Sequence, residues 1–122
     1  MKVQLYRELI AWQKAMDFAV EVYRVTKRFP DDERYGITSQ LRRAVVSISS
    51  NIAEGQGRQS TGEFRQFLGH ARGSLLESET QIQLAERLHY LPAPDTEHLL
   101  ACSAELGKVL NGVIASLQEA RR

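Results

Sequence analysis

The sequence contains one cysteine, three histidines and three prolines among its 122 residues. A single cysteine excludes a disulfide within the chain and a zinc site built from several cysteines. We find no run of about 20 apolar residues, so we expect no membrane-spanning segment and no membrane partner. The first nine residues lack the apolar stretch of a signal peptide, so the expected location is cytoplasmic.

The charge of the chain is nearly balanced, because 16 lysines and arginines face 15 acidic residues and leave a net charge of +1. Such a chain is not an obvious polyanion binder as a whole. However, residues 34–76 carry six arginines and two glutamates, whereas residues 77–120 carry seven acidic and two basic residues. This asymmetry is either a dipolar surface that steers partners or an ordinary grouping of solvated charges.

Apolar residues recur at three- and four-residue steps in four segments, and we find no alternating pattern typical of strands. The four helices are expected at about residues 6–28, 37–54, 61–90 and 95–119, within one domain at residues 1–122. A hydrophobic fraction of 43% in a chain of this length is enough to bury one core. Short connections favour antiparallel neighbours, so the expected fold class is all-α, an antiparallel up-down-up-down four-helix bundle.

The stretch at residues 36–58 is expected to form the central helix, because it combines an apolar stripe with small residues that let other segments come close. We expect Thr38 to cap the start of this helix and Gly55 to end it in a left-handed turn. Ser60 and Glu63 form a capping box for the next helix. Within that helix, Gly69 and Gly73 each cost roughly 1 kcal/mol relative to alanine, which predicts close approach of a neighbouring helix.

The first predicted helix carries two apolar stripes. One contains Trp12, Met16 and Tyr23, and the other contains Phe18 and Val22. The centres of the stripes lie about 120° apart around the helix. A bundle helix usually needs one stripe, so the pair is either a single broad core face or a core face and a face covered by another subunit.

Five arginines are candidate nucleic-acid-binding residues, because guanidinium groups bind phosphate in a planar, two-pronged way. They are Arg42, Arg43, Arg58, Arg65 and Arg72. The alternative is that these arginines pair with acidic residues of a neighbouring helix or subunit. We find no stacking aromatics interleaved with them, which argues against binding of single-stranded nucleic acid.

Four polar residues of the central helix are expected to form a structural network: Ser47, Ser50, Asn51 and Glu54. Asn51 lies at the edge of the apolar stripe, where a buried amide can fix register or oligomeric state. Glu54 has no carboxylate or histidine partner nearby in sequence. A hydrogen-bond network that holds the loop at residues 55–60 is therefore favoured over a general base.

Two carboxylate–histidine pairs are spaced one helical turn apart, Glu86 with His89 and Asp95 with His98. Di-iron bundles use two Glu-x-x-His elements, but these pairs flank a proline hairpin, and the other helices offer no carboxylate on their core stripes. We therefore expect no metal site, no cofactor and no catalytic residue. Cys102 is expected to be a packed thiol, because no base lies at catalytic spacing from it.

Five blocks of the sequence are distinctive in combination: WQKA at 12–15, FP at 29–30, YGITSQLRRA at 35–44, SNIAEG at 50–55 and EF at 63–64. Together they resemble the four-helix-bundle proteins encoded by intervening sequences in bacterial large-subunit ribosomal RNA genes. The resemblance covers about residues 8–90, with Ile37 where leucine is expected. The last predicted helix resembles the family only in general character.

The resemblance implies a bundle that assembles into a ring of identical subunits, expected to be a pentamer. The family is also similar to the accessory protein of diversity-generating retroelements, a basic pentameric barrel that binds nucleic acid and a reverse transcriptase. No enzymatic activity and no role as a ribosome component are implied. The expected function is a non-enzymatic oligomeric scaffold that binds nucleic acid, RNA rather than DNA. The alternative is a protein-interaction module that docks a partner enzyme without nucleic acid.

Overall fold

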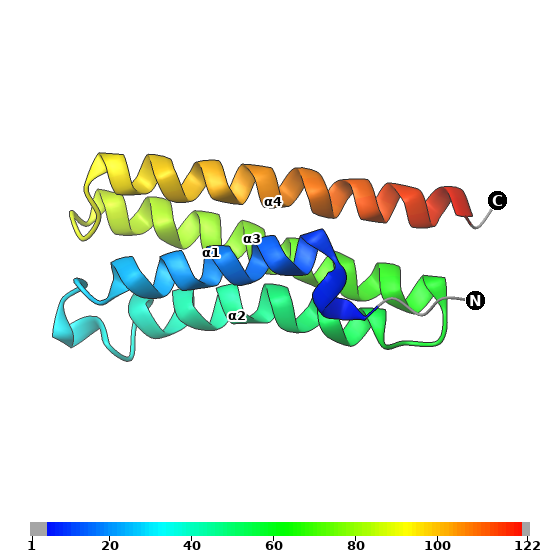
Figure 1. Cartoon of the computed structure of the whole chain (residues 1–122). Coiled ribbons are helices and arrows are strands. Elements are labelled where there is room, and N and C mark those ends of the chain that lie inside the picture. The colour runs from blue at the N-terminus through cyan, green and yellow to red at the C-terminus, as the bar shows by residue number, and fades with distance from the viewer. Residues whose placement is uncertain (1–4, 121–122) are drawn as a thin grey trace.

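The computed structural model describes residues 5–120, and within this range it contains four long helices and no strand. The long helices lie side by side along a common direction (Figure 1). Two single turns of 3-10 helix accompany them. The elements are η1 Tyr6–Glu8, α1 Ile10–Thr26, η2 Asp31–Glu33, α2 Ile37–Gln56, α3 Thr61–Arg87 and α4 Ala93–Ala120. The all-α fold class is therefore confirmed.

Contacts between the helices show that neighbours run antiparallel. Between α2 and α3, the Oγ atoms of Ser47 and Ser74 lie 2.9 Å apart, while Gln40, earlier in α2, contacts Gln81, later in α3. The pairs that join α1 to α4 and α3 to α4 follow the same opposed order: Lys14–Glu105, Glu21–His98 and Arg28–Asp95, then Arg72–Asn111 and Glu79–Ser103. The bundle is therefore up-down-up-down.

The core lies between the four helices, and the apolar stripe predicted for α2 is part of it. Its largest fully buried side chains come from every long helix: Phe18, Val22 and Val25 from α1, Leu41, Val45, Ile48 and Ile52 from α2, Leu68 and Ile82 from α3, and Leu99, Leu106 and Leu110 from α4. Burial of each such side chain stabilises the fold by about 1.5–3 kcal/mol. The bundle is held mainly by this shared core.

Two helices have shorter bounds than their apolar patterns predict. α1 begins at Ile10 rather than near residue 6, because Leu9 is extended and separates it from η1. α3 ends at Arg87 rather than near residue 90, because His89 adopts a left-handed φ of 64°. The amide of Tyr90 then donates to the carbonyl of Ala85, which closes the helix end in a Schellman arrangement.

The expected capping of α2 is wrong at both ends. Thr38 lies inside the helix and is buried, and α2 begins after Gly36 without a side-chain cap. Gly55 also lies inside the helix, which continues to Gln56, and Gly57 at its end has a right-handed conformation. By contrast, α3 begins as predicted, because the Oγ of Ser60 accepts a 3.1 Å hydrogen bond from the amide of Glu63.

Gly55 is required by close packing rather than by a turn. A Cβ atom at this position would lie 2.6 Å from the Cβ of Phe67 and 3.1 Å from the ring of Phe64, both on α3. Gly69 and Gly73, for which close approach was expected, have no atom within 4 Å of such a Cβ in the described chain. The prediction that a neighbouring helix comes close at Gly69 and Gly73 is therefore wrong within one subunit. A neighbouring helix comes close at Gly55 instead.

Gly55→Ala is expected to lower the free energy of unfolding by about 1–3 kcal/mol, because overpacking against Phe67 outweighs the gain in helix propensity. The matched control is Gly112→Ala, at an exposed helical position with no atom within 4 Å of the added methyl in the described chain. This variant is expected to be up to about 1 kcal/mol more stable. Urea denaturation followed by circular dichroism measures both, and equal stabilisation of the two would contradict the packing argument.

α4 is long and apolar enough, by length and composition alone, to cross a membrane, since an 18-residue window within Ala93–Gln118 reaches a mean hydropathy of 1.3. The segment is nevertheless not an unbroken apolar run, because Asp95, Glu97, Glu105 and Lys108 lie within it. Core helices of soluble bundles pass the same test. Here α4 buries Leu99 and Leu106 in the core and forms ion pairs with α1 through Asp95 and Glu105, so we describe it as the fourth helix of the bundle.

Candidate nucleic-acid interface and apolar groove

An apolar groove runs between α1 and α2, with a volume of about 860 Å³. Its large apolar and aromatic side chains are Tyr6 from η1, Trp12, Met16, Val20 and Tyr23 from α1, and Val46 from α2. Arg24 of α1 and Lys27 at the C-terminal end of that helix also line it. The other lining residues of α2 have small side chains: Ser49, Ser50 and Ala53. We refer to this surface as the α1/α2 groove.

The two apolar stripes predicted for the first helix differ in their exposure, and the exposed residues of one stripe line the α1/α2 groove. Phe18 and Val22 of one stripe are fully buried in the core. Met16 and Tyr23 of the other stripe remain 39% and 40% exposed in the groove. Ala19, between them on the same stripe, is buried in the core, and Trp12 is partly buried against the core. The second stripe is therefore only partly covered in the single subunit, and its exposed residues line the groove.

A second pocket, of about 720 Å³, lies where the connection between α1 and α2 meets both helices. It shares Tyr23 and Val46 with the α1/α2 groove. Its lining residues in the described chain are Tyr23, Arg34, Tyr35, Thr38, Ser39, Arg42, Arg43, Val46 and Ser47, and none of these is acidic. We refer to this surface as the basic pocket.

Arg42 is fixed in the wall of the basic pocket by contacts with α1. Its Nε donates a 2.8 Å hydrogen bond to the Oγ1 of Thr26, and its guanidinium also donates to the carbonyl of Tyr23. The guanidinium carbon lies 4.7 Å from the centre of the Tyr23 ring, within the range of a cation–π contact. Arg42 therefore holds α2 against α1 and orients one wall of the pocket.

Arg34, Tyr35 and Arg43 are more open to solvent. The Tyr35 side chain is 88% exposed, and the guanidinium carbon of Arg34 lies 5.8 Å from its ring centre. Arg43 donates a 3.1 Å hydrogen bond to the Oγ of Ser39. Within residues 5–120, neither Arg34 nor Arg43 forms an ion pair with a carboxylate. Their charges are therefore available to an anionic ligand.

The expectation that aromatics are not interleaved with the arginines is wrong for this pocket. Tyr23 and Tyr35 both stand beside arginines in three dimensions. The proximity of Tyr23 to these arginines could not be predicted from local sequence, because Tyr23 lies on α1 and Arg42 lies on α2. The sequence does contain one local signal, Tyr35, which directly follows Arg34 and precedes Arg42 by seven residues.

The structure does not bring the five predicted arginines together, since it places only Arg42 and Arg43 in the basic pocket. Arg58 forms a 3.1 Å ion pair with Glu54 and lies 4.7 Å from the centre of the Phe67 ring. Arg72 donates to Asn111 on α4, and Arg65 lies in the first turns of α3, at the opposite end of α2 from the pocket.

The polar residues predicted on α2 make two separate sets of contacts. Asn51 donates to the carbonyl and to the Oγ of Ser47, at 2.8 and 3.0 Å, and Ser47 reaches across to Ser74 on α3. Glu54 contacts Arg58 and thereby ties the end of α2 to the following loop. Ser50 lies in the α1/α2 groove, outside both sets.

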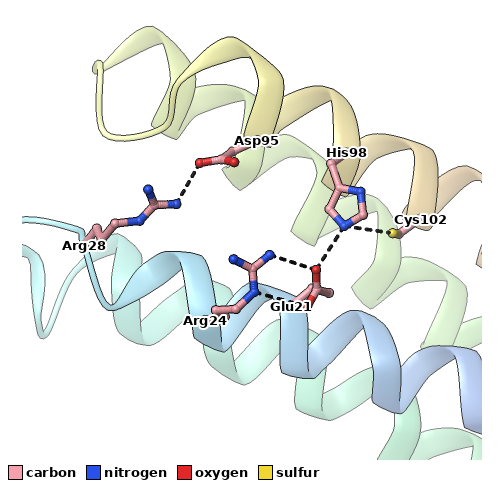
Figure 2. Close-up of polar contacts among 6 residues, drawn as sticks. All are labelled: Glu21, Arg24, Arg28, Asp95, His98 and Cys102. Carbon is pink, nitrogen blue, oxygen red and sulfur yellow. Dashed lines mark hydrogen bonds and ion pairs between the residues drawn. The ribbon is translucent and has the colours of Figure 1, made fainter.

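Polar side chains join α1 to α4 on another face of the bundle (Figure 2). Glu21 accepts a 2.9 Å contact from Arg24 and lies 3.0 Å from the Nε2 of His98, while Arg28 pairs with Asp95 at 2.7 Å. Asp95 and His98 therefore bind partners on α1. Among the side chains that the structure describes, we find no group of three histidine, cysteine or acidic residues that could hold a metal ion.

Cys102 is half-buried, and the structure places a base close to it that the sequence interpretation missed. Its Sγ lies 3.9 Å from the Nε2 of His98, one turn earlier in α4 (Figure 2). Burial raises the pKa of the Cys102 thiol, and the nearby carboxylates of Glu21 and Glu105 raise it further. His98 also directs the same nitrogen toward Glu21, whereas a catalytic relay uses both ring nitrogens. These contacts favour a protonated, structural thiol.

The hydrogen bond from Arg24, followed by that from His98, lowers the pKa of Glu21 to about 2. Because this pKa lies below the ordinary value of 4.5, the stability that Glu21 contributes is present above about pH 4.5 and is lost as the pH falls toward 2. Glu21→Gln is expected to lower the free energy of unfolding at neutral pH by about 1 kcal/mol or less. It is also expected to reduce the loss of stability that occurs as the pH falls from about 4.5 toward 2. Thermal unfolding between neutral pH and about pH 2 measures this, with Glu97→Gln at an exposed site of α4 as the control. If Glu21→Gln loses as much stability between about pH 4.5 and pH 2 as the unmodified protein, Glu21 does not contribute the proposed pH-dependent stability.

These features define a class of protein: an antiparallel four-helix bundle with an open apolar groove on one pair of helices and a basic pocket beside it. Residues 7–112 match the family model for the 23S rRNA-intervening sequence protein, and the chain belongs to that family. The resemblance found in the five sequence blocks is thus confirmed, and it extends beyond residue 90 into α4.

A solved structure with the same fold has a TM-score of 0.80 and 26% sequence identity. It is the crystal structure of a protein with unknown function from the S23 ribosomal protein family of Bacteroides thetaiotaomicron. The match covers 86% of this chain and 98% of that chain. A search of curated proteins finds no match.

Proposed function

We propose that the protein is a non-enzymatic, cytoplasmic homo-oligomer that binds RNA. The observation that carries the RNA-binding part is the basic pocket, which is lined by Arg34, Arg42 and Arg43 together with the exposed Tyr35. Guanidinium groups in an acid-free pocket attract phosphate and bind it with directed hydrogen bonds. Hydroxyl side chains also line the pocket and are suited to the 2′-hydroxyl of RNA.

Assembly is supported by exposed apolar surface on two sides of the subunit. One side is the α1/α2 groove. The other is the outer face of α3, where Leu76 and Leu84 are 57% and 48% exposed on the same face as Gly69 and Gly73. We propose that the groove of one copy receives this face of α3 from a second copy. Contact between two different faces is head-to-tail and closes into a ring when the rotation permits.

The proposed ring is a pentamer, as the family resemblance implies. A ring repeats the basic pocket once per subunit, so a single RNA strand that contacts several pockets is held more tightly than one that contacts a single pocket. The oligomer thereby offsets the small net charge of the individual chain.

A second candidate function is a protein-interaction module without a nucleic-acid role. The volume and apolar lining of the α1/α2 groove favour this alternative, because a helix of a partner protein can occupy such a groove. In that case the purified protein leaves RNA unshifted and captures a partner whose binding survives nuclease treatment.

Light scattering combined with a gel-shift assay on bulk RNA tests the proposal. The expected result is a molar mass that is a multiple of 13.8 kDa, together with retention of RNA at low salt. A monomer that leaves RNA unshifted at low salt would contradict it.

A further inference from the structure

We infer that the basic pocket is a site for single-stranded RNA, in which an unpaired base stacks on Tyr35 while the flanking phosphates bind Arg34 and Arg43. This inference rests on the proposed function and specifies the form of RNA that the pocket accepts. The observations that carry it are the exposure of Tyr35, the absence of acidic lining residues in the described pocket, and the presence there of Arg34 and Arg43, neither of which forms an ion pair with a described carboxylate.

Tyr35 presents its ring from an ordered turn. The amide of Gly36 donates to the carbonyl of Glu33, and the amide of Arg34 donates to that of Asp31, so the backbone on both sides of Tyr35 is held by hydrogen bonds. The ring is nevertheless 88% exposed. An exposed ring of this kind stacks on an unpaired base, whereas the bases of a duplex are already stacked on one another.

The arginines are placed to bind the phosphates that flank such a base. Arg34 lies against the Tyr35 ring, and Arg43 lies on α2 on the same pocket wall as Ser39. Arg42 acts as a positioning residue, since Thr26 and Tyr23 already engage its guanidinium. The pocket volume of about 720 Å³ lies within the range of small-ligand sites, which is sufficient for a nucleotide.

The inference is tested by fluorescence anisotropy with two labelled probes, an oligouridylate and a blunt-ended RNA duplex of equal length. The unmodified protein is expected to bind the single strand more tightly than the duplex. Tyr35→Ala is expected to weaken single-strand binding by about 5- to 100-fold, because it removes one stacked base. Tyr35→Phe retains the stacking surface and is expected to restore affinity to within about twofold of the unmodified protein.

Circular dichroism is expected to show equal helicity for all three proteins, because the Tyr35 side chain is almost fully exposed. Equal affinity for strand and duplex, with no effect of Tyr35→Ala on either, would overturn the single-strand inference and leave RNA binding in place. Failure of the unmodified protein to bind either probe at low salt would overturn the proposed function itself.

Discussion

Replacing Met16 and Val20 with glutamate is expected to convert the proposed oligomer into a monomer of about 13.8 kDa. Both side chains lie in the α1/α2 groove and are 39% and 63% exposed in the single subunit, so the change should leave the bundle core intact. In the proposed assembly, the two new carboxylates would be buried against the apolar face of α3 from the next subunit. Burying an unpaired carboxylate costs several kcal/mol, which is enough to prevent association.

Ala101→Glu combined with Ala104→Glu provides the matched control, because both alanines are exposed on α4, away from the groove. This variant carries the same added charge and is expected to keep the molar mass of the unmodified protein. Light scattering measures the mass, and circular dichroism checks that helicity is preserved. Retention of the oligomer by the Met16/Val20 variant would show that the groove is not the interface between subunits.

Reversing the charge of Arg34 and Arg43 with glutamate is expected to weaken RNA binding at low salt by about 100-fold or more. Each subunit then loses two phosphate contacts and gains two repulsive charges, and an oligomer repeats this loss at every pocket. Neither arginine forms an ion pair within residues 5–120, so the fold should be unaffected. A filter-binding assay with bulk RNA measures the change.

The control for this variant is Arg7→Glu with Lys108→Glu, which makes the same change in net charge at two exposed sites outside the basic pocket, the α1/α2 groove and α3. It is expected to weaken RNA binding by less than about tenfold, through the long-range field alone. Equal losses in the two variants would show that overall charge, rather than the pocket, determines binding.

The helices and their core faces could be predicted because burial in a bundle imposes a repeat of three and four residues on the sequence. The apolar stripe of α2 illustrates this, since Leu41, Val45, Ile48 and Ile52 are all fully buried. The helix ends could not be predicted as well. Gly55 has the local preference of a helix-ending residue, but packing against α3 keeps it inside α2.

The candidate site could be predicted only in part, because its walls come from segments that are distant in sequence. Arg42 and Arg43 were found because two adjacent guanidinium groups are visible in the sequence itself. Which other residues join them depends on how α1 crosses α2, which places Tyr23 in the same pocket. The proximity of His98 and Cys102 was accessible from sequence, since residues four apart are neighbours on a helix.

The dependence of RNA affinity on salt tests the central claim most directly, namely that phosphate contacts in the basic pocket bind a single RNA strand. In a titration of the unmodified protein with an oligouridylate, the logarithm of the association constant is expected to fall linearly with the logarithm of the salt concentration. The slope is expected to be about −0.7 for each phosphate contacted, and shallower for the Arg34/Arg43 variant. An affinity that does not change with salt, or a slope that is the same in the variant, would contradict the account.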